Sequence, residues 1–161
     1  MNTPLLLAKH LRDIHTGGNW TTTNLKDTLT DVTWEEAGKS LFGLNSIAVL
    51  TYHVTYYVDV LLKVLEGGPL DSKDEYSFQL PVIGSQSAWE QLIANALATA
   101  EKTADLIEKL PEEQLFDPFT DEKYGNYYRN IAGIIEHMHY HLGQISLLKK
   151  LVRNEQIHSA G

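Results

Sequence analysis

Four long segments with apolar residues at helical spacing place the strongest constraint on the fold of this chain. They cover roughly residues 3–16, 45–66, 87–110 and 127–153. In each segment apolar side chains recur every three to four residues, which places them on one stripe of an α-helix. The second segment is rich in β-branched and aromatic residues, but its length of about 20 residues is far beyond that of an ordinary strand. The sequence therefore predicts an all-α fold.

Capping signals mark where these helices are expected to begin. Asn45 is placed to cap the second long helix, and Ser87 with Glu90 forms a capping-box pattern at the start of the third. Thr33 and Glu36 form another such pattern, which predicts a short helical turn between the first two long helices. Together the segments predict a four-helix bundle with long connections between helices 1 and 2 and between helices 2 and 3.

The length and charge of the chain limit its class and its partners. The chain fits one domain covering residues 1–161, with residues 154–161 expected as a frayed tail. Lys and Arg number 13 and Asp and Glu 21, and the net charge of −8 argues against nucleic acids and anionic membranes as partners. The chain has no cysteine, which excludes disulfides, cysteine-ligated zinc and a cysteine nucleophile. No segment resembles a signal peptide or a membrane span, so we expect a cytoplasmic protein.

The segment EHMHYHLGQISLLKKL, residues 136–151, carries three histidines within five positions of the last predicted helix. His137 and His141 are four residues apart and lie about 40° apart on one helix face, with Gln144 on the same stripe. His139 points to nearly the opposite side, so we expect it to face solvent or a partner. Such a histidine pair arises by chance too often to identify a metal site, and a third ligand is needed.

His53 is the candidate for that third ligand. It lies on the apolar side of the second long helix, near Leu50 and Val60. A histidine there needs partners for its ring nitrogens, and it is either a neutral core residue bonded to a hydroxyl or carbonyl, or a metal ligand. Because bundle cores are where such proteins assemble metal sites, we predict that His53, His137 and His141 bind zinc, nickel, iron or copper with a fourth position open.

The remaining histidines carry weaker signals. His10 lies beside the apolar stripe of the first helix, where we expect a surface or partly buried structural position; lining of the same cavity is the alternative. His15 lies at the end of that helix, where the helix dipole favours the imidazolium form. His158 falls in the expected frayed tail. No function is assigned to these three or to His139.

Two stretches resemble the DinB/YfiT-like superfamily. They are NSIAVLTYHVTYYV in the second long helix and GNYYRNIAGIIEHMHYHLGQISLLKKL in the last. The family pattern is one histidine in helix two, then H-x-x-x-H followed by x-G-Q-I in the last helix. Here these positions are His53, His137, His141 and the segment 142–145, and the resemblance runs from about residue 3 to residue 153.

The resemblance implies a fold, a site and a chemistry. The fold is a four-helix bundle that is often dimeric, with a three-histidine metal site and an open ligand position. Members of known chemistry are metal-dependent transferases that activate a low-molecular-weight thiol such as bacillithiol or mycothiol, and related isomerases. For this chain the resemblance implies zinc or nickel, with iron or manganese as further options, a small-molecule substrate and a homodimer.

Four hypotheses for the function remain open. In the leading one, a thiol coordinated by the metal loses its proton and attacks an electrophile, and the lack of cysteine fits because a cofactor supplies the nucleophile. In the second, a metal-bound water hydrolyses the substrate, although Glu136 turns about 100° away from His137 and is poorly placed as a general base. The third is a non-catalytic metal-binding or small-ligand-binding protein. The fourth is a helical bundle whose histidines only pack.

Tyr57 and Gln144 are predicted to line the cavity of this site. Gln144 lies one turn from His141 and could orient a histidine or the bound ligand. The alternatives are an ordinary helix residue near a packed glycine for Gln144 and aromatic core packing for Tyr57. Metal binding requires neutral imidazole, so we expect the metal to be lost as the pH falls below the pKa range of histidine.

Overall fold

The computed structural model describes the backbone of residues 2–159 and the side chains of residues 2–155. Within these residues the chain forms α-helices, short 3-10 helices and turns, with no β-strand and one isolated β-bridge between Pro118 and Asn126. The predicted all-α class is therefore confirmed. The frayed tail predicted at 154–161 lies partly outside the described residues. Residues 160 and 161 and the side chains from residue 156 on, which include that of His158, are not described.

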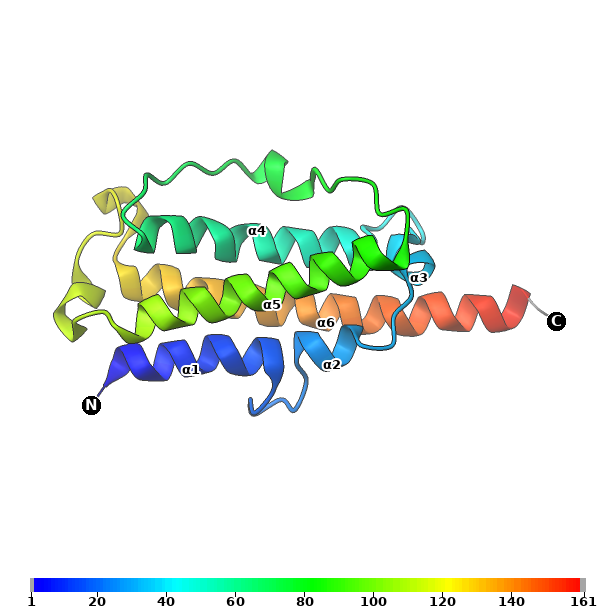
Figure 1. The fold of residues 1–161 in the computed structure, drawn as a ribbon, viewed down its shortest axis with the longest axis horizontal. Coiled ribbons are helices and arrows are strands. Elements are labelled where there is room, and N and C mark those ends of the chain that lie inside the picture. Colours follow the sequence, from blue (N-terminus) through cyan, green and yellow to red (C-terminus); the bar gives the residue numbers. More distant parts are fainter. Residues whose placement is uncertain (1, 160–161) are drawn as a thin grey trace.

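Four long helices and several short ones make up the fold (Figure 1). The long helices are α1 (Thr3–Thr16), α4 (Ile47–Leu65), α5 (Gln86–Glu108) and α6 (Tyr127–Ser159). The short helices are α2 (Leu25–Leu29), α3 (Trp34–Gly38), η1 (Asp74–Phe78), η2 (Glu112–Phe116) and η3 (Glu122–Tyr124).

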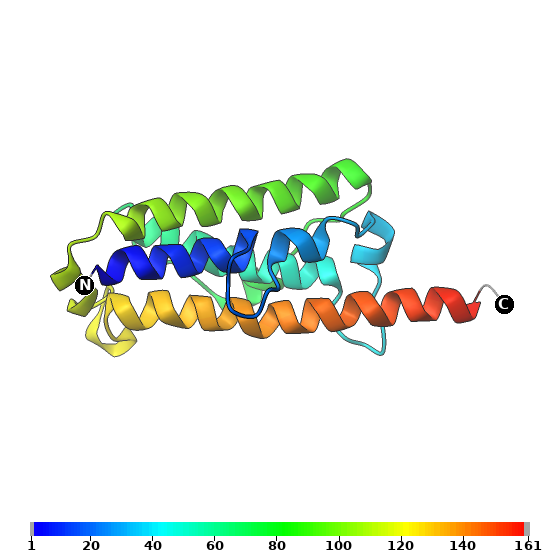
Figure 2. The same cartoon turned by 90° about the horizontal axis from the view of Figure 1, so that it is seen from below.

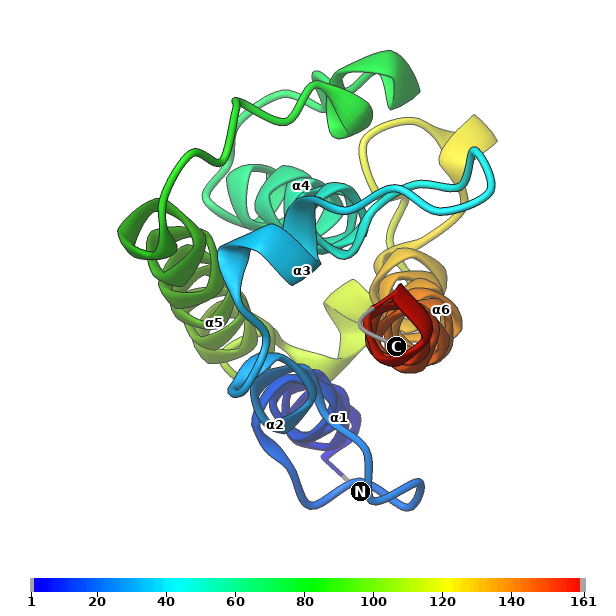
Figure 3. The same cartoon turned by 90° about the vertical axis from the view of Figure 1, so that its right-hand side faces the viewer.

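The long helices lie side by side along the long axis of the molecule (Figures 1 and 2). Seen end-on, they surround a common interior, and each contacts two neighbours in the order α1, α5, α4, α6 (Figure 3). The short helix α2 continues the line of α1, as Figure 2 shows. Long helices that are apolar on one stripe bury that stripe against one another, which is the arrangement that their periodicity requires.

The buried apolar side chains form two clusters along this interior. One cluster includes Trp89, whose indole Nε1–H donates to the carbonyl of Val32 at 2.9 Å and ties α5 to the segment before α3. The second cluster joins the other ends of the long helices and includes Leu11, Leu61, Ile107, Leu115 and Ile131. The expectation that no segment resembles a membrane span is wrong for α4, which alone among the described residues is long and apolar enough to cross a membrane. In the structure 67% of the window tested in α4 is buried inside the protein, because this helix packs in the core.

Two helix starts differ from the predicted ones by one or two residues. The cap of α4 is Ser46 rather than Asn45, because the Ser46 hydroxyl accepts the Val49 N–H. The cap of α5 is Ser85 rather than Ser87, because Ser85 has the extended backbone of a cap residue and its hydroxyl accepts from the backbone N–H three residues on. Several serine and asparagine side chains near each start can cap, so the approach of the preceding chain decides which one does.

Two other local predictions are confirmed, and the predicted end of the last helix is wrong. The capping box of Thr33 and Glu36 is present at α3, with both reciprocal hydrogen bonds formed. The first helix ends at Gly17, which has a positive φ of 116° that favours glycine. The last helix continues to Ser159, beyond the predicted end near 153.

The crossover between α4 and α5 carries the helix η1 to the outer side of α4. Figure 1 shows this segment running along α4, and η1 contacts α4 directly. The N–H of Lys73 donates to the hydroxyl of Tyr56 at 3.0 Å, which helps to hold the crossover against the helix. Residues 74–78 are thereby brought to the part of α4 that carries His53.

Candidate metal centre

Three histidines from two helices meet between α4 and α6. His53 of α4 lies against His137 and His141 of α6, with ring centroids 4.4–4.9 Å apart. One potential ligand atom of each lies within 4.8 Å of those of the others, and the Nε2 atoms of His53 and His137 are 3.0 Å apart. These are the three histidines predicted to form one site, and the structure brings all three together.

A hydrogen-bond chain fixes which nitrogen of His53 faces the cluster. The hydroxyl of Ser77 donates its one proton to the carbonyl of Asp74 at 2.6 Å. It must therefore accept from the Nδ1–H of His53, at 2.8 Å. The neutral ring then carries its lone pair on Nε2, the atom that points at His137.

Gln144 fixes His141 in the same way. Its side-chain oxygen, which can only accept, lies 2.7 Å from Nδ1 of His141. His141 therefore donates from Nδ1 and keeps its lone pair on Nε2. Gln144 thus makes the contact expected of a residue that orients the ring. The alternative interpretation placed Gln144 near a packed glycine. Gly143 is not packed, because a Cβ atom added to it would meet nothing within 4 Å.

The donor atoms fit a divalent transition metal. The Nε2 lone pair of His53 lies 3.0 Å from Nε2 of His137, so either a proton on His137 or a shared cation lies between the two nitrogens. Tetrahedral Zn–N bonds of 2.0–2.1 Å place ligand nitrogens about 3.4 Å apart. The spacing in the cluster, from 3.0 Å to at most 4.8 Å, brackets that value. The three-histidine cluster could therefore bind a metal ion.

The surroundings keep the three rings neutral. Burial lowers the pKa of His53, His137 and His141, and it lowers that of His137 to about 4. The proximity of His141 lowers the pKa of His53 and of His137 further, while the bond to Gln144 opposes the shift at His141. Neutral imidazole is the form that binds metals, so the cluster is competent at neutral pH.

Aromatic side chains cover the cluster on the side of the crossover. Phe78 of η1 stacks on His53 with centroids 4.2 Å apart. Tyr57 meets His53 and His137 edge-on at 5.2 and 5.0 Å. Its hydroxyl donates to Asp74 at 2.6 Å, and burial together with this bond raises the pKa of Tyr57 to about 12. Tyr57 therefore lies beside the cluster.

Three residues of this site were missed in the sequence. Asp74, Ser77 and Phe78 lie in the crossover, which has no helical or strand periodicity and reads as an irregular connection. Ser77 is completely buried and reaches His53 across 24 positions of the chain. No local pattern in the sequence signals such a contact.

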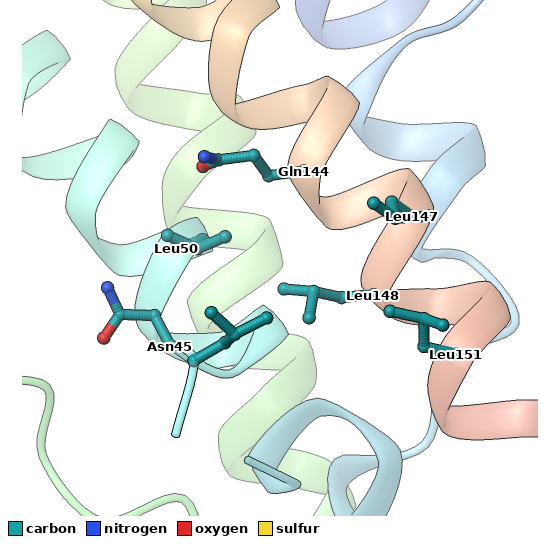
Figure 4. Close-up of a pocket in the computed structure, with 7 residues that line it drawn as sticks. Asn45, Leu50, Gln144, Leu147, Leu148 and Leu151 are labelled. Atoms are coloured by element: carbon teal, nitrogen blue, oxygen red, sulfur yellow. The ribbon is translucent and has the colours of Figure 1, made fainter. Parts of the chain in front are cut away.

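Two pockets flank the cluster. One, of about 260 Å³, lies between the start of α4 and the middle of α6, and Figure 4 shows Gln144 reaching into it among mostly apolar side chains. None of the three cluster histidines lines this pocket, and Gln144, which bonds Nδ1 of His141, is its link to the cluster. The other, of about 360 Å³, is lined by His137 and Tyr57 together with Arg129, Asn130, Gly133 and Ile134.

His10 and His139 lie outside the cluster. His10 is exposed and lines surface pockets that contain none of the three cluster histidines, so the alternative that it lines the same cavity is wrong. His139 is half-buried, and its Nδ1–H donates to the carbonyl of Ile135 in its own helix at 2.9 Å. Glu136 is exposed in the same pocket as His10, which leaves it unavailable as a base for the cluster.

The prediction for His15 is wrong. Its side chain is only 2% exposed, and its Nδ1–H donates to the carbonyl of Leu11 at 2.7 Å. Burial lowers the pKa of His15 to about 4, against the weaker opposing effect of the Leu11 bond. The ring is therefore neutral at pH 7, because the cost of desolvating a charge exceeds the roughly 0.3–1 kcal/mol that a helix dipole returns.

Comparison with known proteins gives one match. The family model of the DinB superfamily matches residues 10–144, a span that contains His53, His137, His141 and Gln144. Neither a curated protein nor a solved structure gave a significant match. The matched span covers most of the chain, and the three histidines that it contains form one cluster in space. The chain belongs to the DinB superfamily.

Proposed function

We propose that this protein is a metal-dependent transferase that activates a low-molecular-weight thiol at the three-histidine cluster. The observation that carries the proposal is the convergence of one ring nitrogen each from His53, His137 and His141, with the Nδ1–H groups of His53 and His141 bonded to oxygen acceptors. Three imidazoles leave an open coordination position, as in catalytic rather than structural sites. Imidazole suits zinc, nickel and iron. Manganese is a further option that comes from the family resemblance alone.

The residues around the cluster have distinct tasks in this proposal. A bound divalent cation supplies Lewis acidity, which lowers the pKa of a thiol to the range where the reactive thiolate predominates. Ser77 and Gln144 hold the rings of His53 and His141 in the tautomer and orientation that present Nε2. Phe78 and Tyr57 cover one side and exclude water there. Because the chain has no cysteine, the nucleophile comes from a separate molecule.

A metal-dependent hydrolase is the second candidate. It needs a general base beside the cluster, and Glu136 lies elsewhere. The carboxylate of Asp74 is close to the cluster, but its Oδ1 already accepts from Tyr57. A metal-binding or small-ligand-binding protein without catalysis is the third candidate, and the same cluster would serve it.

The proposal extends to architecture and assembly. We propose a four-helix bundle of the DinB type that forms a homodimer and acts in the cytoplasm on a small molecule. The ring of contacts among the four long helices supports the bundle. Tyr140 and Leu147, which are 64% and 58% exposed on α6, supply apolar surface for a subunit contact. The net charge of −8 opposes binding to nucleic acids and anionic membranes.

The test uses protein loaded with zinc or nickel beside protein stripped with a chelator. Each is mixed with a small thiol and 1-chloro-2,4-dinitrobenzene; a sulfur–carbon bond forms, chloride leaves and the thiol proton passes to solvent. Metal-dependent thioether formation above the background rate supports the transferase. Metal-dependent hydrolysis of a p-nitrophenyl ester, without thioether formation, would favour the hydrolase. Bound metal with neither activity across a panel of thiols and electrophiles would favour the binding protein.

A further inference from the structure

The pocket beside His137 contains an arginine without a protein partner. The arginines of the chain are Arg12, Arg129 and Arg153. Arg12 pairs with Glu101, Asp105 and Glu108, and Arg153 pairs with Asp31 and Glu36. Within the described residues, the guanidinium of Arg129 makes no hydrogen bond or ion pair, although the chain has an excess of carboxylates.

Two other polar side chains of this pocket have already used their donors. The hydroxyl of Tyr57 donates to Asp74. The side-chain amide of Asn130 donates to the carbonyls of Tyr124 and Asn126, at 3.0 and 2.8 Å. Besides the ring N–H of His137, Arg129 therefore offers the unused side-chain donors of the described pocket lining, and a guanidinium presents them in a fork that matches a carboxylate.

The helix α6 arranges the pocket as one open strip. Arg129, Gly133 and His137 are spaced by four residues and share one face of α6. A Cβ atom on Gly133 would meet nothing within 4 Å, so the surface between the cation and the histidine is free of side-chain bulk. Eight residues of α-helix rise about 12 Å, which sets the reach of a molecule that would contact both ends.

We propose that this pocket binds the carboxylate of the substrate through Arg129 while the reacting end of the molecule lies at the histidine cluster. The inference rests on the proposed function, since it makes the bound thiol or its acceptor an organic acid. A single guanidinium in a protein of net charge −8 favours a singly charged carboxylate over a doubly charged phosphate.

The first test measures thiol binding to the cobalt(II)-loaded protein through the sulfur-to-metal charge-transfer absorption. The probes are 8-mercaptooctanoate, its neutral counterpart 8-mercaptooctanol, and 3-mercaptopropionate, which is too short to reach Arg129. We expect the long acid to bind about fivefold to tenfold more tightly than the long alcohol at low ionic strength, with the preference falling in salt. Equal affinity for the two long probes would overturn the inference. The inference would also be overturned if the short acid were preferred over the long alcohol as strongly as the long acid is.

Variants test whether Arg129 causes the preference for the long acid. Arg129→Gln is expected to abolish the preference for the long acid while leaving cobalt content and the affinity for the alcohol unchanged. Lys123→Gln is the matched control, because it removes an exposed positive charge that does not line the pocket. A preference that survives in Arg129→Gln, or disappears equally in Lys123→Gln, would overturn the proposed role of Arg129. Gly133→Leu is expected to weaken both long probes, because its side chain enters the strip.

A second readout separates this inference from the metal proposal. The Nε–H resonance of Arg129 is followed by NMR in ¹⁵N-labelled metal-free protein during addition of octanoate, and Arg129→Gln assigns the signal. A saturable shift with octanoate, absent with octanol, supports the carboxylate site even in a protein that binds neither zinc nor cobalt. The absence of any shift in such a protein would overturn it. Failure of the metal site and failure of the carboxylate site are thus distinguished.

Discussion

His15 and His53 are both buried histidines on apolar helix faces, yet their surroundings differ in kind. Each is almost inaccessible to solvent, and burial lowers the pKa of each. His15 donates to the carbonyl of Leu11 in its own helix, whereas His53 donates to Ser77 of the crossover and turns its lone pair toward two other histidines. Burial and a lowered pKa are therefore shared by a packing residue and a candidate ligand, and the convergence of ring nitrogens separates them.

The largest expected difference between the two histidines is in metal content. His53→Ala removes one of three ligands, so near-stoichiometric zinc or nickel in the wild type should be lost. His15→Leu should retain the wild-type content, because His15 is not part of the cluster. Elemental mass spectrometry of tag-free protein after incubation with the metal at pH 8 measures both. Equal metal content in wild type and His53→Ala would remove the distinction between the two histidines.

Acid stability should depend on the burial of His15. The pKa of His15 is about 4 in the folded protein, whereas its ordinary value is near 6.5. Between these two pH values the unfolded chain therefore takes up a proton that the native state does not. Stability is therefore lost as the pH falls from about 6.5 toward 4, by about 3 kcal/mol in total for this group. His15→Leu should remove that part of the loss. Urea unfolding of metal-free protein at pH 7 and pH 4.5 measures it, and an unchanged pH dependence in the variant would contradict the proposed burial of a neutral ring.

Removal of the hydrogen-bond partners of the cluster histidines should weaken metal binding without abolishing it. Ser77→Ala and Gln144→Leu each remove the acceptor of an Nδ1–H, and such changes typically weaken metal binding about 10-fold to 100-fold. Competition with a chromogenic chelator measures the affinity. Ser77→Thr and Gln144→Glu retain an acceptor and should restore most of it. If these conservative variants bind metal as weakly as the first pair, the two bonds do not orient the rings.

The smallest effect is expected at His139, which sharpens the comparison with His15. Both donate from Nδ1 to the carbonyl four residues earlier, but His139 is only half-buried. His139→Ala should change the free energy of unfolding at pH 7 by less than about 0.5 kcal/mol and leave metal content unchanged. Chemical denaturation and elemental analysis check both values. A loss of metal in this variant would mean that the face of α6 opposite the cluster contributes to the site.

Helix boundaries show how far local signals reach. The capping box at Thr33 has two reciprocal parts, and the structure has both. At α4 and α5 the cap falls on Ser46 and Ser85, close to Asn45 and Ser87. Neighbouring residues there have similar capping ability, and the path of the incoming chain chooses between them.

The sequence alone was enough to predict the helical class and the inward face of each ligand-bearing helix. Helical periodicity is a property of the local backbone, so it places His137, His141 and Gln144 on one stripe of α6 and His53 on the buried stripe of α4. The bond between His141 and Gln144 follows from that register, because the two residues are three positions apart.

Only the tertiary structure decided what surrounds those residues. The docking of the crossover brings Asp74, Ser77 and Phe78 to the cluster, and the packing of α1 buries His15 deeply enough to keep it neutral. Both outcomes depend on contacts between segments far apart in the chain, for which an irregular segment or a single histidine carries no periodic signal. Burial then outweighs local effects such as the helix dipole, because desolvating a charge costs more free energy than one helix end returns.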